Sequence, residues 1–169
     1  MPQISEKITP ADGCAERFSP PPLSPLVRTK RMEIEITPIG TLHCKIRKPA
    51  DAPKNYSESA ETGRLEILPQ YLEALSGIQV GQTIVVLFWL HEARRDLLKV
   101  YPRGDRSRGL RGVFSTRSPV RPNPIALSEL KVLRIRDNVV EVTGVDVIDG
   151  TPILDIKSAV RPETTRQTA

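Results

Sequence analysis

The chain has 169 residues, of which 38% are hydrophobic and 27% are charged, and its formal net charge is +5. This length favours one ordinary hydrophobic core over two independent domains, and two cysteines without CxxC spacing exclude a disulfide framework and a cysteine-rich zinc site. No apolar run approaches the roughly 18 to 20 residues of a membrane-spanning helix, and no basic segment followed by an apolar stretch indicates a secretory signal. We therefore expect a cytoplasmic protein that binds neither a membrane nor a metal.

The first 32 residues have the composition of a tail. They hold six of the 16 prolines, including three in a row at residues 20–22, and show no apolar periodicity. Such a segment cannot bury enough apolar surface to fold by itself. We expect residues 1–32 to be disordered or loosely docked, residues 33–162 to form the folded domain, and residues 163–169 to be a second tail.

Short apolar runs broken by turn residues dominate the rest of the chain. They are EIEITPIG, RLEIL, TIVVLFWL, ALSELKVLRI and NVVEVTGVDV, at residues 33–40, 64–68, 83–90, 126–135 and 138–147. Apolar residues alternate within these runs with a period of two, which is typical of strands with one buried face. The pattern predicts a mainly β protein built on an antiparallel sheet or barrel.

Two local patterns complete the fold prediction. In RIRDNVVEV, Asp137 and Asn138 provide the turn of a β-hairpin. In LPQYLEALSGI, Pro69 suits the first turn of a helix and Gly77 its end. We expect one or two short helices at the periphery of the sheet.

The apolar periodicity fails between Leu90 and Ile125, and positive charge collects there. Residues 94–121 contain nine basic residues against Asp96 and Asp105, so the rest of the chain is slightly negative. A phosphate-binding surface requires basic residues gathered in one place, whereas a merely soluble protein does not. The alternative interpretation is a solvated loop without a ligand.

The segment TRSPVRPNPI, residues 116–125, lies at the end of this region and contains three prolines. Each proline fixes its own φ and holds the preceding residue extended, which makes the segment stiff. Its polar side chains include Arg117, Arg121 and Asn123. Preorganised polar groups lose less entropy when a ligand binds, which favours a binding site over a rigid connection between strands.

The segment VIDGTPILDI, residues 147–156, combines a turn with an extended run that begins at Pro152. A turn of this kind joins two strands, and its backbone groups can also bind the edge of an adenine or a ribose. Asp146, Asp149 and Asp155 lie close together in the sequence. If two of them shared a pocket, the pKa of one would rise toward neutrality, and that carboxylate could accept a proton.

A third segment, FWLHEARRD at residues 88–96, places His91 and Glu92 at the end of an apolar strand. His91 is a candidate acid or base, although a single histidine often only packs or orients a neighbour. The chain has no P-loop, GxGxxG or GxSxG motif. An adenosyl cofactor would therefore be held in an uncommon way.

The segments RGVFSTRSPVRPNPIALS and GVDVIDGTPILDIKSAV, in this order, resemble the TrmO family, also called TsaA-like or YaeB-like proteins. The resemblance extends from Glu33 to Val160 and includes ITPIG and GRLEILPQYLEALSGI. It implies an antiparallel β-barrel methyltransferase that uses S-adenosylmethionine and forms a homodimer with cofactor pockets near the subunit interface. It also implies a tRNA substrate, methylated on the exocyclic nitrogen of N6-threonylcarbamoyladenosine next to the anticodon.

The resemblance also implies site residues. The cofactor contacts are Pro53, Lys54, Asn55, His91, Glu92, Arg117, Leu127, Ile148, Asp149, Gly150 and Thr151. The residues expected to contact the anticodon stem-loop of the tRNA are Arg103, Arg106, Arg108, Arg111, Arg121 and Asn123. The general base is open among Asp149, His91 and Tyr101.

Two departures from the family pattern leave other functions open. The sequence ends soon after DIKSAV, without the extra C-terminal domain of some bacterial members, and Ala126 stands where glycine is usual. The alternatives are an S-adenosylmethionine-dependent methyltransferase that acts on a small molecule, and a non-enzymatic RNA-binding β-barrel.

Overall fold

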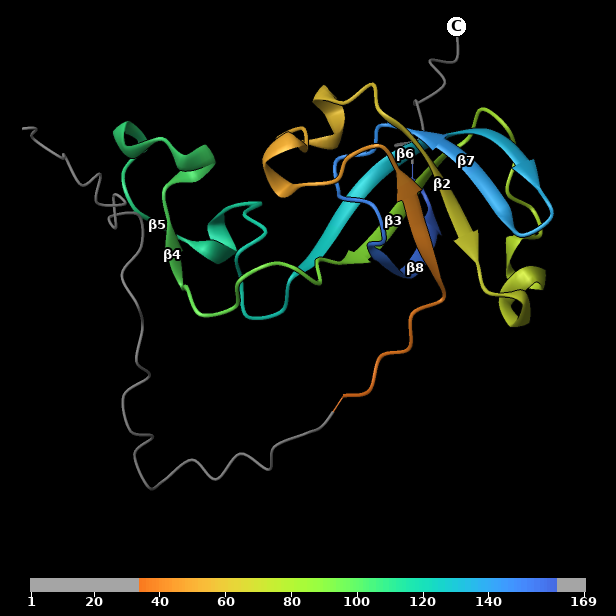
Figure 1. The fold of residues 1–169 in the computed structure, drawn as a ribbon, viewed down its shortest axis with the longest axis horizontal. Coiled ribbons are helices and arrows are strands. Elements are labelled where there is room, and N and C mark those ends of the chain that lie inside the picture. Colours follow the sequence, from red (N-terminus) through yellow and green to blue (C-terminus); the bar gives the residue numbers. More distant parts are fainter. Residues whose placement is uncertain (1–33, 161–169) are drawn as a thin grey trace, which may run out of the picture.

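Six strands of the computed structural model form one closed antiparallel barrel, and two shorter strands form a separate sheet (Figure 1). The barrel strands are β1 (Gly40–Cys44), β2 (Thr62–Ile67), β3 (Thr83–Trp89), β6 (Ile125–Arg136), β7 (Val139–Thr143) and β8 (Pro152–Ser158), in the order β1-β2-β7-β6-β3-β8. The structure describes residues 34–160, so the tails predicted at residues 1–32 and 163–169 lie outside the described residues. The predicted mainly β barrel is confirmed.

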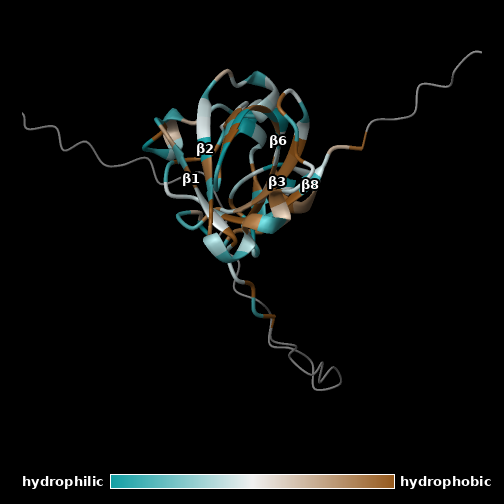
Figure 2. Cartoon of the chain, turned by 90° about the vertical axis from the view of Figure 1, so that its right-hand side faces the viewer, coloured by the Kyte–Doolittle hydropathy of each residue, from teal (hydrophilic) through white to brown (hydrophobic). Residues whose placement is uncertain are grey.

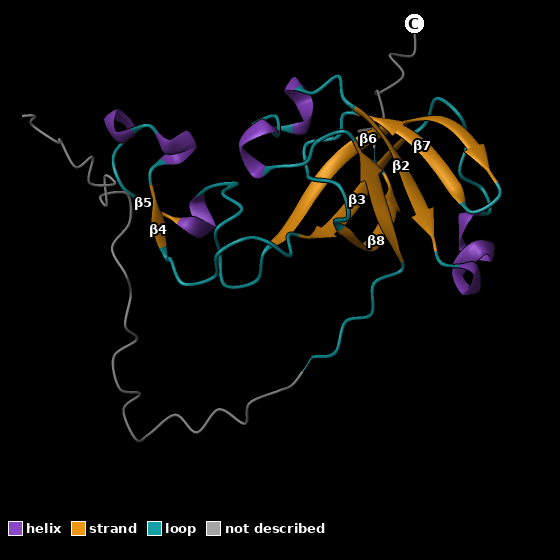
Figure 3. Cartoon of the chain, viewed as in Figure 1, coloured by secondary structure: helices purple, strands orange, loops and turns teal. Residues whose placement is uncertain are grey.

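Short 3₁₀ helices lie outside the barrel, and the small sheet lies to one side of it (Figure 3). The small sheet pairs β4 (Lys99–Val100) with β5 (Arg111–Gly112). The helices are η1 (Pro49–Asp51), η2 (Tyr56–Glu58), η3 (Pro69–Leu75), η4 (Pro102–Gly104), η5 (Arg106–Arg108) and η6 (Val113–Ser115). None of the helices in the described part of the chain has the length and apolar character needed to cross a membrane.

The strands β2 and β3 bury alternate side chains, as expected for strands with one buried face. In β3, Ile84, Val86 and Phe88 are almost fully buried, while the residues between them are partly exposed. The apolar strands surround the interior of the barrel in Figure 2, which shows the molecule turned by 90°. Burial of these side chains provides the main driving force for closing the sheet.

The predicted hairpin and helix are both present. Asp137 and Asn138 join β6 to β7, and Asp137 has a positive φ of 49°. The Asn138 side chain donates a hydrogen bond of 2.9 Å to the carbonyl of Ile67, which ties the turn to β2. The helix lies at the predicted place but is the tighter η3, and Gly77, with a φ of 90°, follows its end.

The prediction of a strand over EIEITPIG is wrong for most of that run. Residues 34–39 are irregular, and only Gly40 belongs to β1. Ile34 is 70% exposed and Ile36 is 49% exposed, so the alternating pattern has no packed face to bury. Pro38 also lacks the N–H that a strand would donate to a neighbour.

The barrel closes where β1 meets β8. β1 pairs with β2 over five residues, but with β8 only at Gly40↔Ile153 and Thr41↔Pro152. The chain therefore passes close to both neighbouring strands at Gly40. A Cβ atom at this position would clash with the backbone of Glu66 and Ile67, which explains why glycine is needed here.

The long basic loop, residues 90–124, extends from one end of the barrel (Figure 1). It leaves at the end of β3 and returns at the start of β6, and the Leu90 N–H donates to the Pro124 carbonyl at 2.8 Å where the two ends meet. The loop carries β4, β5 and η4 to η6. This arrangement holds a mostly irregular segment against a rigid support.

Candidate active site

A cavity of about 1070 Å³ lies between the basic loop and the barrel. Its walls come from three places: the basic loop, the segment after β1, and the segment that joins β7 to β8. The lining residues include Pro49, Ala52, Pro53, Lys54, Asn55, Leu90, His91, Glu92, Tyr101, Arg103, Arg108, Arg111, Arg117, Pro119, Val120, Ala126, Asp146, Val147, Ile148 and Thr151. Segments far apart in the sequence thus meet at one site.

The cavity combines an apolar floor with charged walls. Leu90, Ala126 and Val147 provide apolar surface next to the barrel. The side chain of Thr151 is buried, and its hydroxyl donates a hydrogen bond of 2.6 Å to the carbonyl of Ile148, which fixes the turn at the floor. This combination suits a ligand with one flat apolar part and several charged groups.

Arg117 links the basic loop to the other two walls. Its guanidinium group lies 5.6 Å from the centre of the Tyr56 ring, in a cation–π contact. It also interacts electrostatically with Asp146. The Tyr56 hydroxyl in turn donates to Glu129 at 3.4 Å, so the aromatic ring under Arg117 is itself held. The sequence offered no signal for the contact with Tyr56, because the two residues are 61 positions apart in different loops.

Asp146 is held in the wall of the cavity by the barrel. The hydroxyl of Ser128 in β6 is fully buried and donates a hydrogen bond of 2.6 Å to the Asp146 carboxylate. Burial raises the pKa of Asp146, although Ser128, backbone N–H groups including that of Tyr56, and the charge of Arg117 oppose this rise. The predicted shared pocket of aspartates is absent from the described residues, and burial is the cause of the raised pKa.

The raised pKa of Asp146 predicts a pH-dependent cost to stability. The folded state favours the protonated form of the Asp146 carboxyl. The contribution of this carboxyl to stability is therefore complete below its pKa in the unfolded chain, which is about 3.9 for an aspartate. The contribution is lost as pH rises through the higher pKa of the folded state. We expect the free energy of unfolding of the wild type, relative to Asp146→Asn, to fall over this window. Urea unfolding of both proteins from pH 4 to pH 8 measures it, and a constant difference would contradict the prediction.

Most of the residues predicted to bind the cofactor line the cavity. They are Pro53, Lys54, Asn55, His91, Glu92, Arg117, Ile148 and Thr151, and the base candidate Tyr101 lies with them. Leu127, Asp149 and Gly150 do not line it. Leu127 is 43% exposed on β6, next to the inward-facing Ser128. The assignment of these residues to a cofactor remains a prediction.

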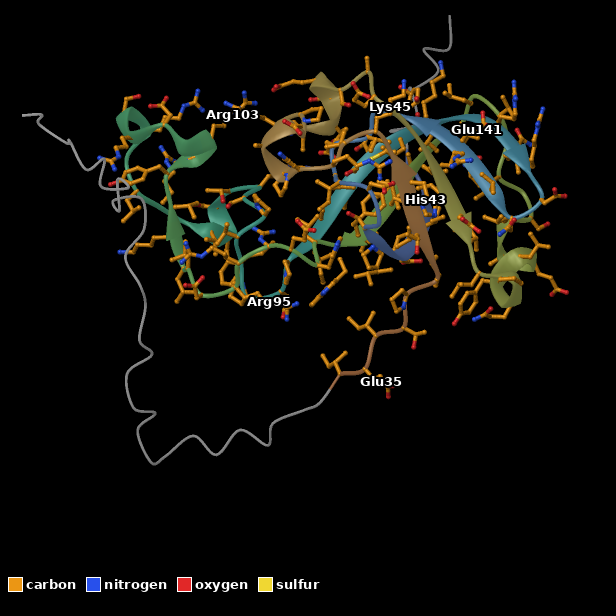
Figure 4. All side chains as sticks on the ribbon, in the orientation of Figure 1. Glu35, His43, Lys45, Arg95, Arg103 and Glu141 are labelled. Carbon is orange, nitrogen blue, oxygen red and sulfur yellow. The ribbon has the colours of Figure 1, made fainter. Side chains whose placement is uncertain are left out.

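Asp149 lies in a separate groove of about 490 Å³ on β1, which also contains His43 (Figure 4). Its carboxylate accepts a hydrogen bond of 2.9 Å from the backbone N–H of Cys44 and forms an ion pair with Arg47. The Gly150 N–H donates to the carbonyl of Leu42. These contacts fasten the turn to β1, so the structure assigns the Asp149 side chain a bracing contact and places it away from the cavity.

Among the predicted tRNA contacts, Arg106, Arg121 and Asn123 lie outside the cavity lining. Arg121 donates hydrogen bonds from Nη2 to the carbonyls of Val113 and Thr116, at 2.9 and 3.0 Å. Its Nε atom is buried and has no partner in the described structure. Arg121 therefore braces the stiff segment that presents Arg117.

The arginines of the basic loop differ in how far their charge is neutralised. Arg103, which Figure 4 labels, forms an ion pair of 2.6 Å with Glu58 that connects the loop to η2. Arg108 pairs with Asp105 at 3.2 Å. Arg106 lies 6.0 Å from the ring centre of Tyr101. Within the described range, no carboxylate lies within ion-pair distance of Arg111, which is exposed at the rim of the cavity. Arg111 thus retains the most accessible charge of this set.

Comparison with known proteins identifies the family. The family model described as tRNA-methyltransferase O N-terminal domain matches residues 41–162. The chain belongs to this family. A probable S-adenosyl-L-methionine-binding protein of Methanothermobacter thermautotrophicus is 43% identical over 75% of this chain and 90% of its own length. An S-adenosyl-L-methionine-binding protein of Archaeoglobus fulgidus is 38% identical over 72% of this chain and 86% of its own.

Solved structures of the family share the fold. A crystal structure of TrmO from Pseudomonas aeruginosa matches with a TM-score of 0.62 and 32% identity, over 76% of this chain and 57% of the solved one. A second TrmO structure from the same species matches with a TM-score of 0.64 and 30% identity, over 83% and 61%. The chain therefore spans about three fifths of these solved proteins. The family resemblance predicted from the two motifs is confirmed.

Proposed function

We propose that this protein is an S-adenosylmethionine-dependent tRNA methyltransferase that acts on the exocyclic nitrogen of N6-threonylcarbamoyladenosine next to the anticodon. The observation that carries the proposal is the cavity, which brings both family motifs together beneath a basic loop. Membership in the tRNA-methyltransferase O family and the names of the relatives support the same reaction class and the same cofactor. The proposed location is the cytoplasm, because the tRNA substrate is modified in the cytoplasm.

The residues of the cavity fit S-adenosylmethionine. Its sulfonium and ammonium groups are cations that suit the carboxylate of Glu92, and its carboxylate suits Lys54 or Arg117. The apolar residues of the floor, which include Ile148, offer a surface for the adenine ring. The volume of about 1070 Å³ is large enough to hold the cofactor together with part of a nucleotide substrate.

The protein's task in this reaction is alignment. When bound, the cofactor supplies a methyl group that is already activated by a positively charged sulfur. The cavity residues must then hold the acceptor in line and exclude water. The stiff segment at residues 116–125, braced by Arg121, suits this task because its prolines and hydrogen bonds limit movement of Arg117.

A methyl-transfer assay tests the proposal. The full-length protein is incubated with methyl-labelled S-adenosylmethionine and tRNA that carries threonylcarbamoyladenosine, with unmodified tRNA as the control. We expect label only in the modified tRNA. Cofactor binding without transfer to any tRNA would contradict the proposal, transfer to a metabolite alone would favour a small-molecule enzyme, and RNA binding without cofactor binding would favour a non-enzymatic RNA-binding barrel.

The proposed tRNA contact predicts a change in salt dependence. Arg111→Ala removes an exposed charge at the cavity rim, and each lost phosphate contact reduces the slope of log affinity against log salt by about 0.7 to 0.9. We expect this reduction when binding of tRNA is titrated between 50 and 200 mM salt. Arg136→Ala, at the far end of β6 from the basic loop, is the matched control and should leave the slope unchanged. An equal change in both variants would contradict an interface at the loop.

The proposal includes a homodimer in which the cavities lie near the subunit interface. Phe114 is 82% exposed and Leu127 is 43% exposed, and both occur in or next to the segment that matches the family motif. Large exposed apolar side chains of this kind favour a protein contact. Light scattering on the purified full chain measures the state, and a monomer at micromolar concentration would contradict this part of the proposal.

A further inference from the structure

The cavity contains two carboxylates within the described range, and they differ in their surroundings. Glu92 lies on the basic loop with a side chain that is 56% exposed, 3.9 Å from His91. Asp146 lies in the segment between β7 and β8, and its carboxylate is partly buried against the barrel. An exposed glutamate on a loop has freedom to move, whereas Asp146 is anchored to a rigid wall.

The anchor of Asp146 is a hydroxyl group inside the barrel wall. Ser128 is fully buried on the core side of β6, opposite Val86 of β3. A buried hydroxyl is costly unless it forms a hydrogen bond, and the Ser128 hydroxyl donates to Asp146 at 2.6 Å. β6 therefore carries a polar side chain at a core position, and this side chain fixes the direction of the Asp146 carboxylate.

Two further groups face the carboxylate from the other walls of the cavity. The backbone N–H of Tyr56 donates to it from η2, and Arg117 attracts it from the basic loop. These groups favour the ionised form, while burial favours the protonated form and has the larger effect. A carboxylate with a raised pKa is a stronger proton acceptor than an exposed one. Asp146 thus has both the position and the basicity that proton transfer requires.

We infer that Asp146 is the general base that takes the proton from the acceptor nitrogen, an inference that rests on the proposed function. As the lone pair of the exocyclic nitrogen forms the new N–C bond, the C–S bond breaks and its electron pair stays on sulfur. The nitrogen becomes strongly acidic in this step, so a carboxylate suffices as the base. The N–H proton passes to a carboxylate oxygen of Asp146, the N–H electron pair remains on nitrogen, and water later removes the proton.

The other candidates are less well placed. The carboxylate of Asp149 is engaged by Arg47 and by the Cys44 N–H in the separate groove. His91 is an exposed residue on the loop. Tyr101 lies on the same loop, where its ring contacts Arg106. Only Asp146 combines a place in the cavity with an anchor in the barrel core.

Asp146→Asn tests the inference, because the amide keeps the shape of the side chain and cannot accept the proton. We expect kcat for methyl transfer to fall by about 10²- to 10⁴-fold. The affinity for S-adenosylmethionine, measured by calorimetry, should stay within about threefold of that of the wild type. Asp155→Asn, at a half-buried position outside the cavity where the carboxylate pairs with Lys157, is the matched control and should leave both quantities unchanged. A normal kcat in Asp146→Asn, or lost cofactor affinity with a normal kcat at saturation, would overturn the inference.

Ser128→Ala provides a second test in which the base remains. Loss of the hydrogen bond removes an effect that lowers the pKa of Asp146, so this pKa should rise in a carboxyl NMR titration of the cofactor-free protein. The acidic limb of the kcat profile should move upward by the same amount, with its plateau retained. If the pKa of Asp146 shifts while the acidic limb of the kcat profile stays in place, the limb reports another group, such as His91 or Glu92. This result would overturn the inference.

The assay of the wild type distinguishes failure of the proposed function from failure of the inference about Asp146. If the wild type transfers no methyl group to tRNA, the proposed function fails and the inference fails with it. If the wild type is active and Asp146→Asn is equally active, the proposed function stands and the inference alone is wrong.

Discussion

Arg117→Ala is expected to raise the dissociation constant for S-adenosylmethionine by about 10- to 100-fold. The reason is the loss of a charge-assisted contact, which contributes about 1.5 to 3 kcal/mol when the partner is a charged group. Arg117 is suited to such a contact because it lines the cavity and its plane is held over the Tyr56 ring. Isothermal titration calorimetry of the cofactor against wild type and variant measures the change.

Two further variants test whether the effect depends on the planar shape of the Arg117 side chain and on its position in the cavity. Arg117→Lys keeps the charge but lacks the planar fork that stacks on Tyr56, so we expect an intermediate affinity. Arg134→Ala removes an arginine that pairs with Glu141 on the barrel, outside the cavity, and should bind the cofactor normally. Unchanged affinity in both Arg117 variants would place the cofactor elsewhere.

The same substitution has a second consequence, at Asp146. Because the charge of Arg117 lowers the pKa of that carboxyl, its removal should raise the Asp146 pKa further. The acidic limb of the activity profile should then move to higher pH in Arg117→Ala, in the same direction as in Ser128→Ala. Agreement between two variants on different walls of the cavity would connect the limb to Asp146 independently of cofactor affinity.

The sequence predicted the fold well where a strand has one buried face. In β2 the alternation of apolar residues follows the actual burial residue by residue, and the Asp137–Asn138 turn marks the hairpin. β3 is apolar at almost every position, yet it buries only alternate side chains. The pattern was wrong at residues 34–39 because alternation describes the side chains, whereas a strand also needs a neighbouring backbone. Which run finds a partner is decided by the closed barrel, and no local pattern contains that information.

The candidate site was predictable only in part, for a related reason. The motifs identified segments that line the cavity, including Arg117 and Ile148, but not which way each side chain points. Asp149 and Asp146 lie three residues apart in one segment, yet one contacts Arg47 in the groove and the other contacts Ser128 at the cavity wall. These directions depend on partners about 100 and 18 residues away in the sequence.

The family motif ITPIG has a structural explanation at its glycine. Gly40 pairs with Ile67 of β2 and with Ile153 of β8, so it lies at the seam where the barrel closes. Only two residue pairs connect β1 to β8, and one of them involves Gly40. The seam therefore depends on a backbone approach that a side chain would prevent.

Gly40→Ala is expected to destabilise the protein by about 3 kcal/mol or more, which is at the upper end of the usual cost of overpacking. The added Cβ would meet the backbone carbonyl of Glu66 and the Cα of Ile67, and neither can move without opening the β1–β2 pairing. Thermal unfolding should show a fall in Tm of about 10 °C. Denaturant unfolding gives the free energy directly.

Gly112→Ala is the matched control for Gly40→Ala. Gly112 lies in β5, has an extended backbone with a φ of −60°, and no atom lies within 4 Å of an added Cβ. The same chemical change should therefore alter the free energy of unfolding by less than about 0.5 kcal/mol. Similar losses in both variants would show that the cost does not come from the closure of the barrel at Gly40.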